Sequence, residues 1–196
     1  MHCVNVSFVA VVHMAVALGA APAARQAAGS VLPIFVDYDA PPVQLDQLTT
    51  VADAVAVFRI EGIRFESSED AKVGRARDVT RYDARLVETL KPYARLPANE
   101  GTLTITRLGG QHTENGKTVR SAVRGFEDFQ QNGEYVLFLT WNTRTVEFDI
   151  AYGPNGSYQL LPSGVVRPLG RSEVATKQEG KANGSFLQEL RIASAR

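Results

Sequence analysis

The stretch Tyr135-Val136-Leu137-Phe138-Leu139 is apolar at every position, and the fold is best worked out from it. An edge strand leaves one of its faces in water, so a run that is apolar on both faces predicts the most buried strand of a sheet. Upstream, the side chains of residues 54–61 alternate with a period of two, and the last two outward positions are Arg59 and Glu61. That alternation is typical of a strand whose outer half faces water.

The remaining chain carries further short runs with strand-like composition. We expect strands over residues 82–90, 103–108, 118–123, 135–141, 146–152, 158–161 and 165–169. Regularly spaced short strands without helical patterns between them indicate an antiparallel sandwich or barrel. Asn-Gly pairs favour tight turns because both residues tolerate positive φ, and Asn115-Gly116 and Asn155-Gly156 each lie between strand-like runs. Both pairs therefore predict hairpins.

Two helices are expected outside the strand region. After Pro41-Pro42, the spacing of Leu45, Leu48 and Ala52 predicts one short helix. Near the end, Ser185 with Gln188 forms the pattern of a capping box. Apolar residues at helical spacing follow it, namely Phe186, Leu187, Leu190 and Ala193. The chain should thus be mainly β, with a short N-terminal helix and a C-terminal helix that docks on the sheet or plugs one end of a barrel.

The first 24 residues have the pattern of an export signal. Residues 4–21 are almost continuously apolar and carry no Lys, Arg, Asp or Glu, and Ala21-Pro22-Ala23 supplies a small-x-small cleavage pattern. Cleavage between Ala23 and Ala24 is the first expectation. Only His2 stands where positive charge normally begins a signal, so an uncleaved membrane anchor remains the alternative.

Three segments follow from this interpretation. Residues 1–23 form the signal peptide, residues 24–42 a lead-in rich in Ala and Pro with an extended apolar piece at 31–36, and residues 43–196 a single β-barrel domain. Export places the protein in the periplasm or outside the cell, and the Ala- and Arg-rich usage suggests a bacterium. After cleavage, no second stretch reaches membrane length.

Cleavage also removes most of the reactive side chains. Cys3 is the only cysteine, both methionines lie within the signal, and His112 is the only histidine that follows it. Thiol catalysis, disulfides and thiolate metal sites are therefore excluded from the mature chain, and no cofactor or metal site emerges from any motif. The domain must be held together by its core alone.

Charge excludes one class of partner. The chain has 21 basic and 21 acidic residues, and the signal contributes neither. A nucleic-acid-binding protein would show a basic excess. The neutral balance gives no support to binding of an anionic membrane either.

Residues 61–85 hold twelve charged residues of mixed sign. The middle of this region, residues 66–78, has no strong apolar period, so it is expected to be a solvated loop between the first two strands. A loop that binds an ionic ligand would keep one sign of charge. A binding loop here is thus the weaker interpretation.

His112 is the candidate for acid-base chemistry, since its reference pKa lies near neutrality. It stands with Glu114 in a polar stretch that leads into Asn115-Gly116. One histidine without a partner motif is more simply an exposed turn residue. A catalytic arrangement of a serine, His112 and Asp128 has no positive support, because no Gly-x-Ser-x-Gly pattern occurs.

Carboxylates and aromatic residues supply the other candidates. Two acidic pairs, Glu127 with Asp128 and Glu147 with Asp149, have the side chains of a glycosidase site, but charges beside strands are usually solvent-facing. An aromatic platform for a sugar or peptide would use Trp141, Tyr135, Tyr152 and Tyr158. Core or cross-strand packing of these rings is the simpler expectation.

Several local patterns resemble exported bacterial proteins with a netrin-like domain, the small barrel also found in tissue inhibitors of metalloproteinases. The pieces that carry the resemblance are residues 52–57, Leu90-Lys91, residues 103–110 and residues 133–139, with a looser match at 158–168. The resemblance implies a small antiparallel barrel of the oligonucleotide/oligosaccharide-binding type with a helix across one end. Those inhibitors present an amino-terminal cysteine to the protease zinc, which the mature chain lacks, and Pro92 stands where glycine is expected.

The leading hypothesis is therefore an exported, non-enzymatic binding or interaction module that takes a protein or glycan partner in the cell envelope. The first alternative is an envelope hydrolase that uses His112 with a serine or carboxylate partner. The second is an inhibitor-like module that acts on a protease.

Overall fold

The computed structural model describes residues 31–36, 38, 40–42, 44–70, 75–98, 100–114 and 116–196. The expected cleavage position between Ala23 and Ala24 lies outside them. Within the described ranges, no helix is both long enough and apolar enough to cross a membrane.

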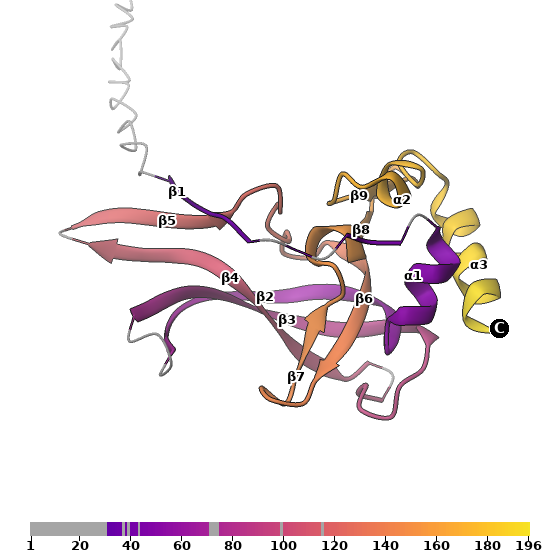
Figure 1. The fold of residues 1–196 in the computed structure, drawn as a ribbon, viewed down its shortest axis with the longest axis horizontal. Coiled ribbons are helices and arrows are strands. Elements are labelled where there is room, and N and C mark those ends of the chain that lie inside the picture. Colours follow the sequence, from indigo (N-terminus) through magenta and orange to yellow (C-terminus); the bar gives the residue numbers. More distant parts are fainter. Residues whose placement is uncertain are drawn as a thin grey trace, which may run out of the picture.

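The protein is mainly β, as the strand patterns predict, and its sheet curls strongly into a half-barrel (Figure 1). The strand order is β1-β5-β4-β3-β2-β6-β8-β9, and β7 also pairs with β6. All pairings are antiparallel except that of β1 with β5. The oligonucleotide/oligosaccharide-binding type stays a prediction. The strands are β1 (Val31–Ile34), β2 (Ala54–Asp70), β3 (Arg75–Lys91), β4 (Thr102–Glu114), β5 (Lys117–Val123), β6 (Glu134–Asn142), β7 (Glu147–Ile150), β8 (Ser157–Leu160) and β9 (Val166–Pro168).

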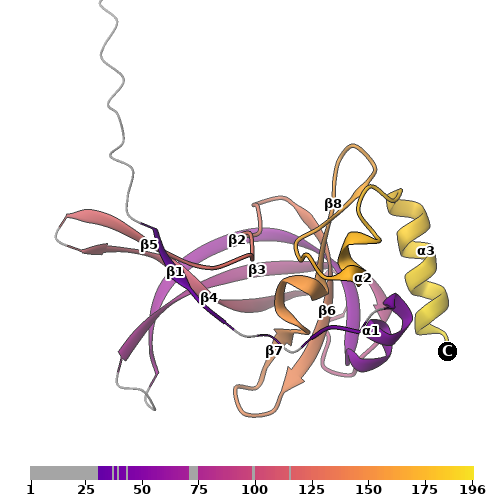
Figure 2. The same cartoon turned by 45° about the horizontal axis from the view of Figure 1, so that its top comes forward.

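Both expected helices are present, and they lie together at one end of the sheet (Figure 2). They are α1 (Leu45–Val51) and α3 (Asn183–Ser194), and a short helix, α2 (Glu173–Thr176), precedes α3. The capping-box prediction is wrong, because α3 begins two residues before Ser185. Its N-cap is Ala182, which supplies no side-chain bond.

Lys91, the last residue of β3, closes the C-terminal end of α1. Its ammonium group donates to the backbone carbonyls of Thr49, Thr50 and Ala52 at 2.9, 3.0 and 2.6 Å. The last carbonyls of a helix have no partner within the helix, and a cation also interacts favourably with that end of the helix dipole. Lys91 thus joins α1 to the sheet.

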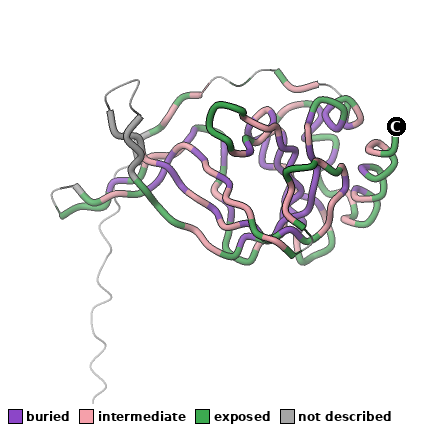
Figure 3. Tube along the Cα trace, turned by 90° about the horizontal axis from the view of Figure 1, so that it is seen from below, coloured by how far each residue is buried: buried purple, intermediate pink, exposed green. Residues whose placement is uncertain are grey.

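The core is divided into two layers by the sheet. One layer packs the helices against one sheet face and includes Phe138, Tyr158 and Phe186. The other fills the inside of the half-barrel and includes Phe58 and Tyr135. Figure 3 shows the buried residues gathered in the body of the fold, whereas the described part of the projecting β4–β5 ribbon is mostly exposed or intermediate.

Strand β6 belongs to both layers, as its apolar sequence predicts. Val136 and Phe138 face the helices, and Tyr135, Leu137 and Leu139 face the inside of the half-barrel. All five are 0 % exposed. Burial of this run on both faces is confirmed, although its strand is not the most buried one: β6 ends in half-buried residues, whereas all four residues of β8 are buried.

The prediction of a loop over residues 66–78 is wrong. Strands β2 and β3 pair through this region, from Glu66 opposite Val79 to Asp70 opposite Arg75, and only residues 71–74 lie outside the described ranges. The mixed charges nearby are cross-strand ion pairs, which suit an exposed ribbon. They join Glu61 to Arg85 at 2.6 Å, Arg64 to Asp83 at 2.7 Å and Glu66 to Arg81 at 2.7 Å.

The lead-in segment contributes a strand of its own. Residues 31–34 form β1, which pairs with β5 in parallel from Val31 opposite Arg120 to Ile34 opposite Val123. The extended apolar piece expected at residues 31–36 is therefore part of the sheet rather than a free leader.

One of the two expected hairpins is present. Strands β4 and β5 pair down to Glu114 opposite Lys117, which confirms the first hairpin, although residue 115 lies outside the described ranges. The prediction of a hairpin at Asn155-Gly156 is wrong. These residues belong to a 3-10 turn, η1 (Gly153–Gly156), and β7 and β8 on either side each pair with β6. Position 156 requires glycine because the backbone there lies close to Ala151, and a Cβ atom would overlap the Ala151 carbonyl oxygen.

Candidate functional site

His112 has a carboxylate partner that the sequence did not reveal. Its Nδ1 lies 2.8 Å from Oδ2 of Asp78, and the hydroxyl of Ser121 donates to the same oxygen at 2.7 Å. The Asp78 side chain is only 14 % exposed, whereas that of His112 is 39 % exposed. The three residues come from β3, β4 and β5.

A bend in β4 brings these strands together. Gly109 has a φ of 95°, and at this point β4 leaves β3 and begins to pair with β5. A Cβ on Gly110 would lie 3.4 Å from the Cβ of Asp78 and 3.1 Å from the carbonyl oxygen of Val79. The paired glycines thus let the Asp78 side chain reach across the bend to Ser121 and His112.

The order of these bonds differs from that of a catalytic triad. In a triad the imidazole stands between the carboxylate and the hydroxyl, so that it can take the hydroxyl proton. Here the carboxylate of Asp78 stands in the middle and accepts from both neighbours. The cluster therefore ties three strands together, and Ser121 is not activated by His112.

Asp128 has other partners. It accepts from the guanidinium of Arg120 and, at 3.4 Å, from the hydroxyl of Tyr82. The arrangement of a serine, His112 and Asp128, which had no support in the sequence, gains none here, since the carboxylate beside His112 belongs to Asp78. Glu114 ends β4, and its side chain lies outside the described part of the structure.

The four aromatic residues do not form a platform. Tyr135 and Tyr158 are both fully buried, in different core layers, and Tyr158 packs on Phe138 rather than opposite Tyr152. Tyr152 is half-buried at the start of η1, with a φ of 54°. Trp141 is half-buried, and the guanidinium carbon of Arg95 lies over its ring, 4.5 Å from the centre of the ring. Core packing is thus confirmed for Tyr135 and Tyr158, and cross-strand pairing of Tyr152 with Tyr158 is wrong.

The candidate carboxylate pairs are held in separate surface contacts. Glu127 pairs with Arg167 at 3.0 Å, and Glu147 with Arg81 at 3.5 Å. Asp149 accepts from the Asn142 side-chain amide at 2.8 Å. Each acid is held by a basic or amide side chain, Glu147 sharing Arg81 with Glu66, which is the ordinary arrangement beside strands and not that of a glycosidase site.

A cavity of about 320 Å³ lies where the half-barrel is open. Strand β4 and strand β7 approach each other there without a hydrogen-bonded ladder, and Val36 and Tyr38 lie over the gap. We call it the seam cavity. Its walls are partly apolar and partly polar, and they comprise Val36, Tyr38, Thr106, Arg107, Leu108, Val123, Phe126, Asp149, Ile150 and Gly153. The volume is within the range of small-molecule sites, which combine apolar walls with a few polar groups.

Arg107 is the unusual residue of the seam cavity. It is 7 % exposed, and its guanidinium stacks on Phe126 at 3.4 Å from the ring centre. Its two terminal nitrogens donate to the carbonyls of Glu127 and Phe126 at 2.9 and 3.2 Å. Burial lowers the pKa of Arg107 from its ordinary value. Its Nε and the hydroxyl of neighbouring Thr106 are buried and have no hydrogen-bond partner among the described residues.

Sequence reasoning missed Arg107 because it sits in an ordinary strand pattern. Arg107 alternates with Ile105 on the inner face of β4, a place where an apolar side chain is the default. A charged residue at an inward position of an expected strand is the signal that was available. The alternation of inward and outward side chains along β4 changes at Gly109-Gly110, and this change obscured which face of the strand was inward.

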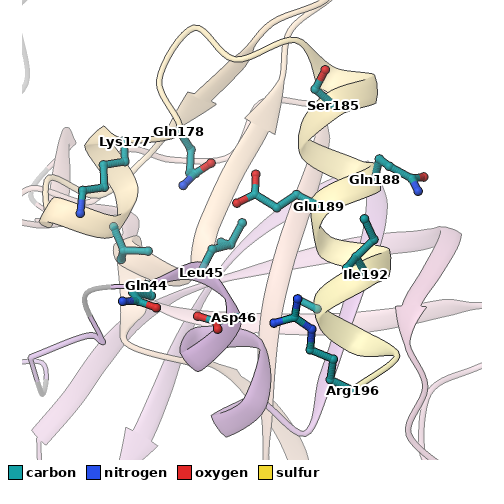
Figure 4. Close-up of a pocket in the computed structure, with 12 residues that line it drawn as sticks. Gln44, Leu45, Asp46, Lys177, Gln178, Ser185, Gln188, Glu189, Ile192 and Arg196 are labelled. Carbon is teal, nitrogen blue, oxygen red and sulfur yellow. The ribbon is translucent and has the colours of Figure 1, made fainter.

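Two larger hollows lie on the surface. A groove of about 670 Å³ separates α1 from α2 and α3, and its lining includes Gln44, Lys177, Glu189 and Ile192 (Figure 4). Lys177 and Glu189 already have ion-pair partners in the protein. No residue that lines this groove is among the described residues with an unpartnered buried polar atom.

The second hollow, of about 760 Å³, is lined mainly by amide side chains and by the ion-paired Arg59 and Glu134. One of these amides, Asn183, has a buried Oδ1 without a partner, although its amide nitrogen bonds to the carbonyl of Leu161 at 3.2 Å. Neither surface hollow combines a buried charge with apolar walls, as the seam cavity does.

Within the described ranges, no group of three or more His, Cys, Asp or Glu residues is arranged to hold a metal ion. No protein-family model matches the chain, and no curated protein matches it in sequence.

Proposed function

We propose that the protein is an exported, non-enzymatic binding module, and that it takes its ligand in the seam cavity. The observation that carries this proposal is that one cavity combines apolar wall residues with Arg107, a buried charged residue that has an unpartnered donor. Buried polar groups are normally satisfied, so an unsatisfied one at a cavity is a reason to expect a bound molecule. Export rests on the sequence of residues 1–24, and the netrin-like resemblance supports a module that binds rather than catalyses.

A fragment screen by NMR on isotopically labelled protein tests the site. We expect binding fragments to shift the backbone amides of residues 106–108 and 149–153. Leu108→Trp should abolish these shifts by filling the cavity. Leu103→Trp is the matched control, because Leu103 is also a half-buried leucine of β4 in the same core layer but does not line the cavity. If no fragment shifts these amides, or if both variants respond alike, the proposal is wrong.

The export proposal has a separate test. The intact mass of protein recovered from the periplasm or medium of a bacterial host should correspond to a chain that begins at Ala24. Retention of the full chain in the membrane fraction would instead support the anchor alternative. A protein or glycan partner in the envelope is compatible with either result, and it would be captured by the mature chain.

The hydrolase alternative keeps one favourable observation, the 2.8 Å contact of His112 Nδ1 with Asp78. A carboxylate in this position orients an imidazole as a general base. Should a hydrolytic activity be found, His112→Ala would decide the matter. Loss of at least about a hundredfold in rate supports the alternative, and unchanged activity excludes it.

A further inference from the structure

Arg107 carries a buried positive charge that the protein neutralises only in part. No carboxylate of the described residues lies within ion-pair distance of it. Asp128 is an acid whose charge acts on Arg107, and that carboxylate is already paired with Arg120. Among these three groups one positive charge is in excess, and Asp149, the acid that also lines the cavity, is exposed to solvent rather than paired with Arg107.

The contacts that Arg107 does make are weaker than an ion pair. Two backbone carbonyls accept from it, and the faces of Phe126 and Phe129 lie 3.4 and 5.0 Å from it. Such ring contacts are favourable for a cation but do not cancel its charge. A buried charge without a counter-ion is strongly unfavourable in a protein interior.

We propose that the seam cavity binds a monocarboxylate with a short apolar body, whose carboxylate pairs with Arg107 while the body lies against Leu108, Val123 and Ile150. This inference rests on the proposed function and names the ligand class for the same site. The carboxylate supplies a counter-charge to the Arg107 guanidinium, which lines the cavity. Arginine is suited to this role because its planar donors match the geometry of a carboxylate.

The other residues that line the cavity favour a ligand with one charged end and one apolar end. Five of the residues that line the cavity are aliphatic or aromatic and carry no polar side-chain atom, namely Val36, Leu108, Val123, Phe126 and Ile150. A dianion such as phosphate would leave these walls unused and would need more than one cation. Asp149, at the rim, is exposed and repels a second negative charge.

The experiment compares acids with their neutral amides at constant ionic strength. Butanoate, hexanoate, octanoate and benzoate are titrated into the mature protein, each beside its primary amide, with chloride as the salt control. The readouts are the thermal midpoint and the ¹⁵N-resolved Nε–H resonance of Arg107. We expect the acids to raise the midpoint and shift that resonance, and the amides to bind at least about tenfold more weakly.

Variants locate the effect. Arg107→Met should weaken binding of the acids by about tenfold to a hundredfold, which is the range for a charge-assisted hydrogen bond. Arg120→Met is the matched control, since Arg120 also neighbours Asp128 but is exposed and does not line the cavity. Asp149→Asn should tighten binding by up to about fivefold, because it removes an exposed like charge. This variant and the amide comparison remain informative if Arg107→Met does not fold.

The outcomes separate the two proposals. If acids and amides bind the cavity equally well, the carboxylate inference is wrong and the binding module stands. If acids bind but the Arg107 resonance does not move, or phosphate binds more tightly than any monocarboxylate, the inference is also wrong. If neither acids, amides nor other fragments reach the cavity, both proposals fail.

Discussion

Lys91 offers the sharpest test of how the helical layer is attached to the sheet. Its ammonium group bonds to three carbonyls at the end of α1, and replacement by Met removes the charge while keeping a side chain of similar length. The carbonyls of Thr49, Thr50 and Ala52 would then lose their cationic partner. We expect the free energy of unfolding to fall.

The size of the loss follows from the contacts. A hydrogen bond to a charged group contributes about 1.5–3 kcal/mol net, and a cation at a helix C-terminus adds about 0.3–1 kcal/mol. The three bonds share one ammonium group, and Lys91 is half-buried, so water replaces part of what is lost. We therefore expect a total of about 2–3 kcal/mol rather than three full bonds. For a domain of this size that corresponds to a fall in thermal midpoint of about 4–12 °C.

Urea unfolding followed by far-UV circular dichroism measures this loss, with Lys177→Met as the matched control. Lys177 is an exposed lysine that pairs only with Glu173 one helical turn away, at 2.7 Å. Exposed pairs contribute little, so the control should unfold at the wild-type midpoint. If Lys91→Met unfolds at the same urea concentration as the control, the attachment of α1 does not depend on this lysine.

Three further changes probe other parts of the fold. Asp78→Ala should destabilise the protein by about 1–3 kcal/mol and should speed amide exchange mainly in the β4–β5 ribbon, because the carboxylate joins three strands; exchange that rises equally everywhere would contradict this. Burial raises the pKa of Tyr82 from 10.0 to about 12, so its unfolded form loses a proton first and stability should fall as pH rises from 10 to 12. In urea titrations over that range, Tyr82→Phe should show a flatter decline than the wild type. Gly156→Ala should cost at least about 3 kcal/mol through overlap with a backbone carbonyl, or prevent folding. Gly184→Ala, with open space around it in α3, should instead raise stability by about 0.5–1 kcal/mol in the same assay.

Periodicity predicted most of the strands because each buried face leaves a visible pattern. The run at residues 135–139 identified the central strand, since both of its faces are covered. Periodicity failed at residues 66–78, where β2 and β3 continue to pair although the sequence has no strong apolar period. A strand held by cross-strand ion pairs and backbone bonds resembles a solvated loop in its composition. The prediction at Asn155-Gly156 failed for another reason. Glycine is required at position 156 by close packing and does not form a hairpin turn there.

The candidate sites were harder to predict than the fold. His112 was identified as the remaining histidine, but Asp78 lies 34 positions away and meets it only through the bend at Gly109 and Gly110. Arg107 was not identified, because neither its burial nor the gap between β4 and β7 is encoded locally. Sites formed where a curled sheet stays open depend on how far it curls, and no short motif specifies that curvature.

The sharing of β2 and β6 between two core layers has a consequence for how the molecule responds to damage. Neighbouring residues such as Val136 and Leu137 serve opposite layers, so a shift of the backbone that relieves a defect on one face disturbs the packing on the other. The helical layer and the interior of the half-barrel are therefore mechanically coupled through strands such as β2 and β6. A molecule that binds in the seam cavity and tightens the half-barrel would, by the same coupling, also stiffen the distant end where α1 and α3 meet.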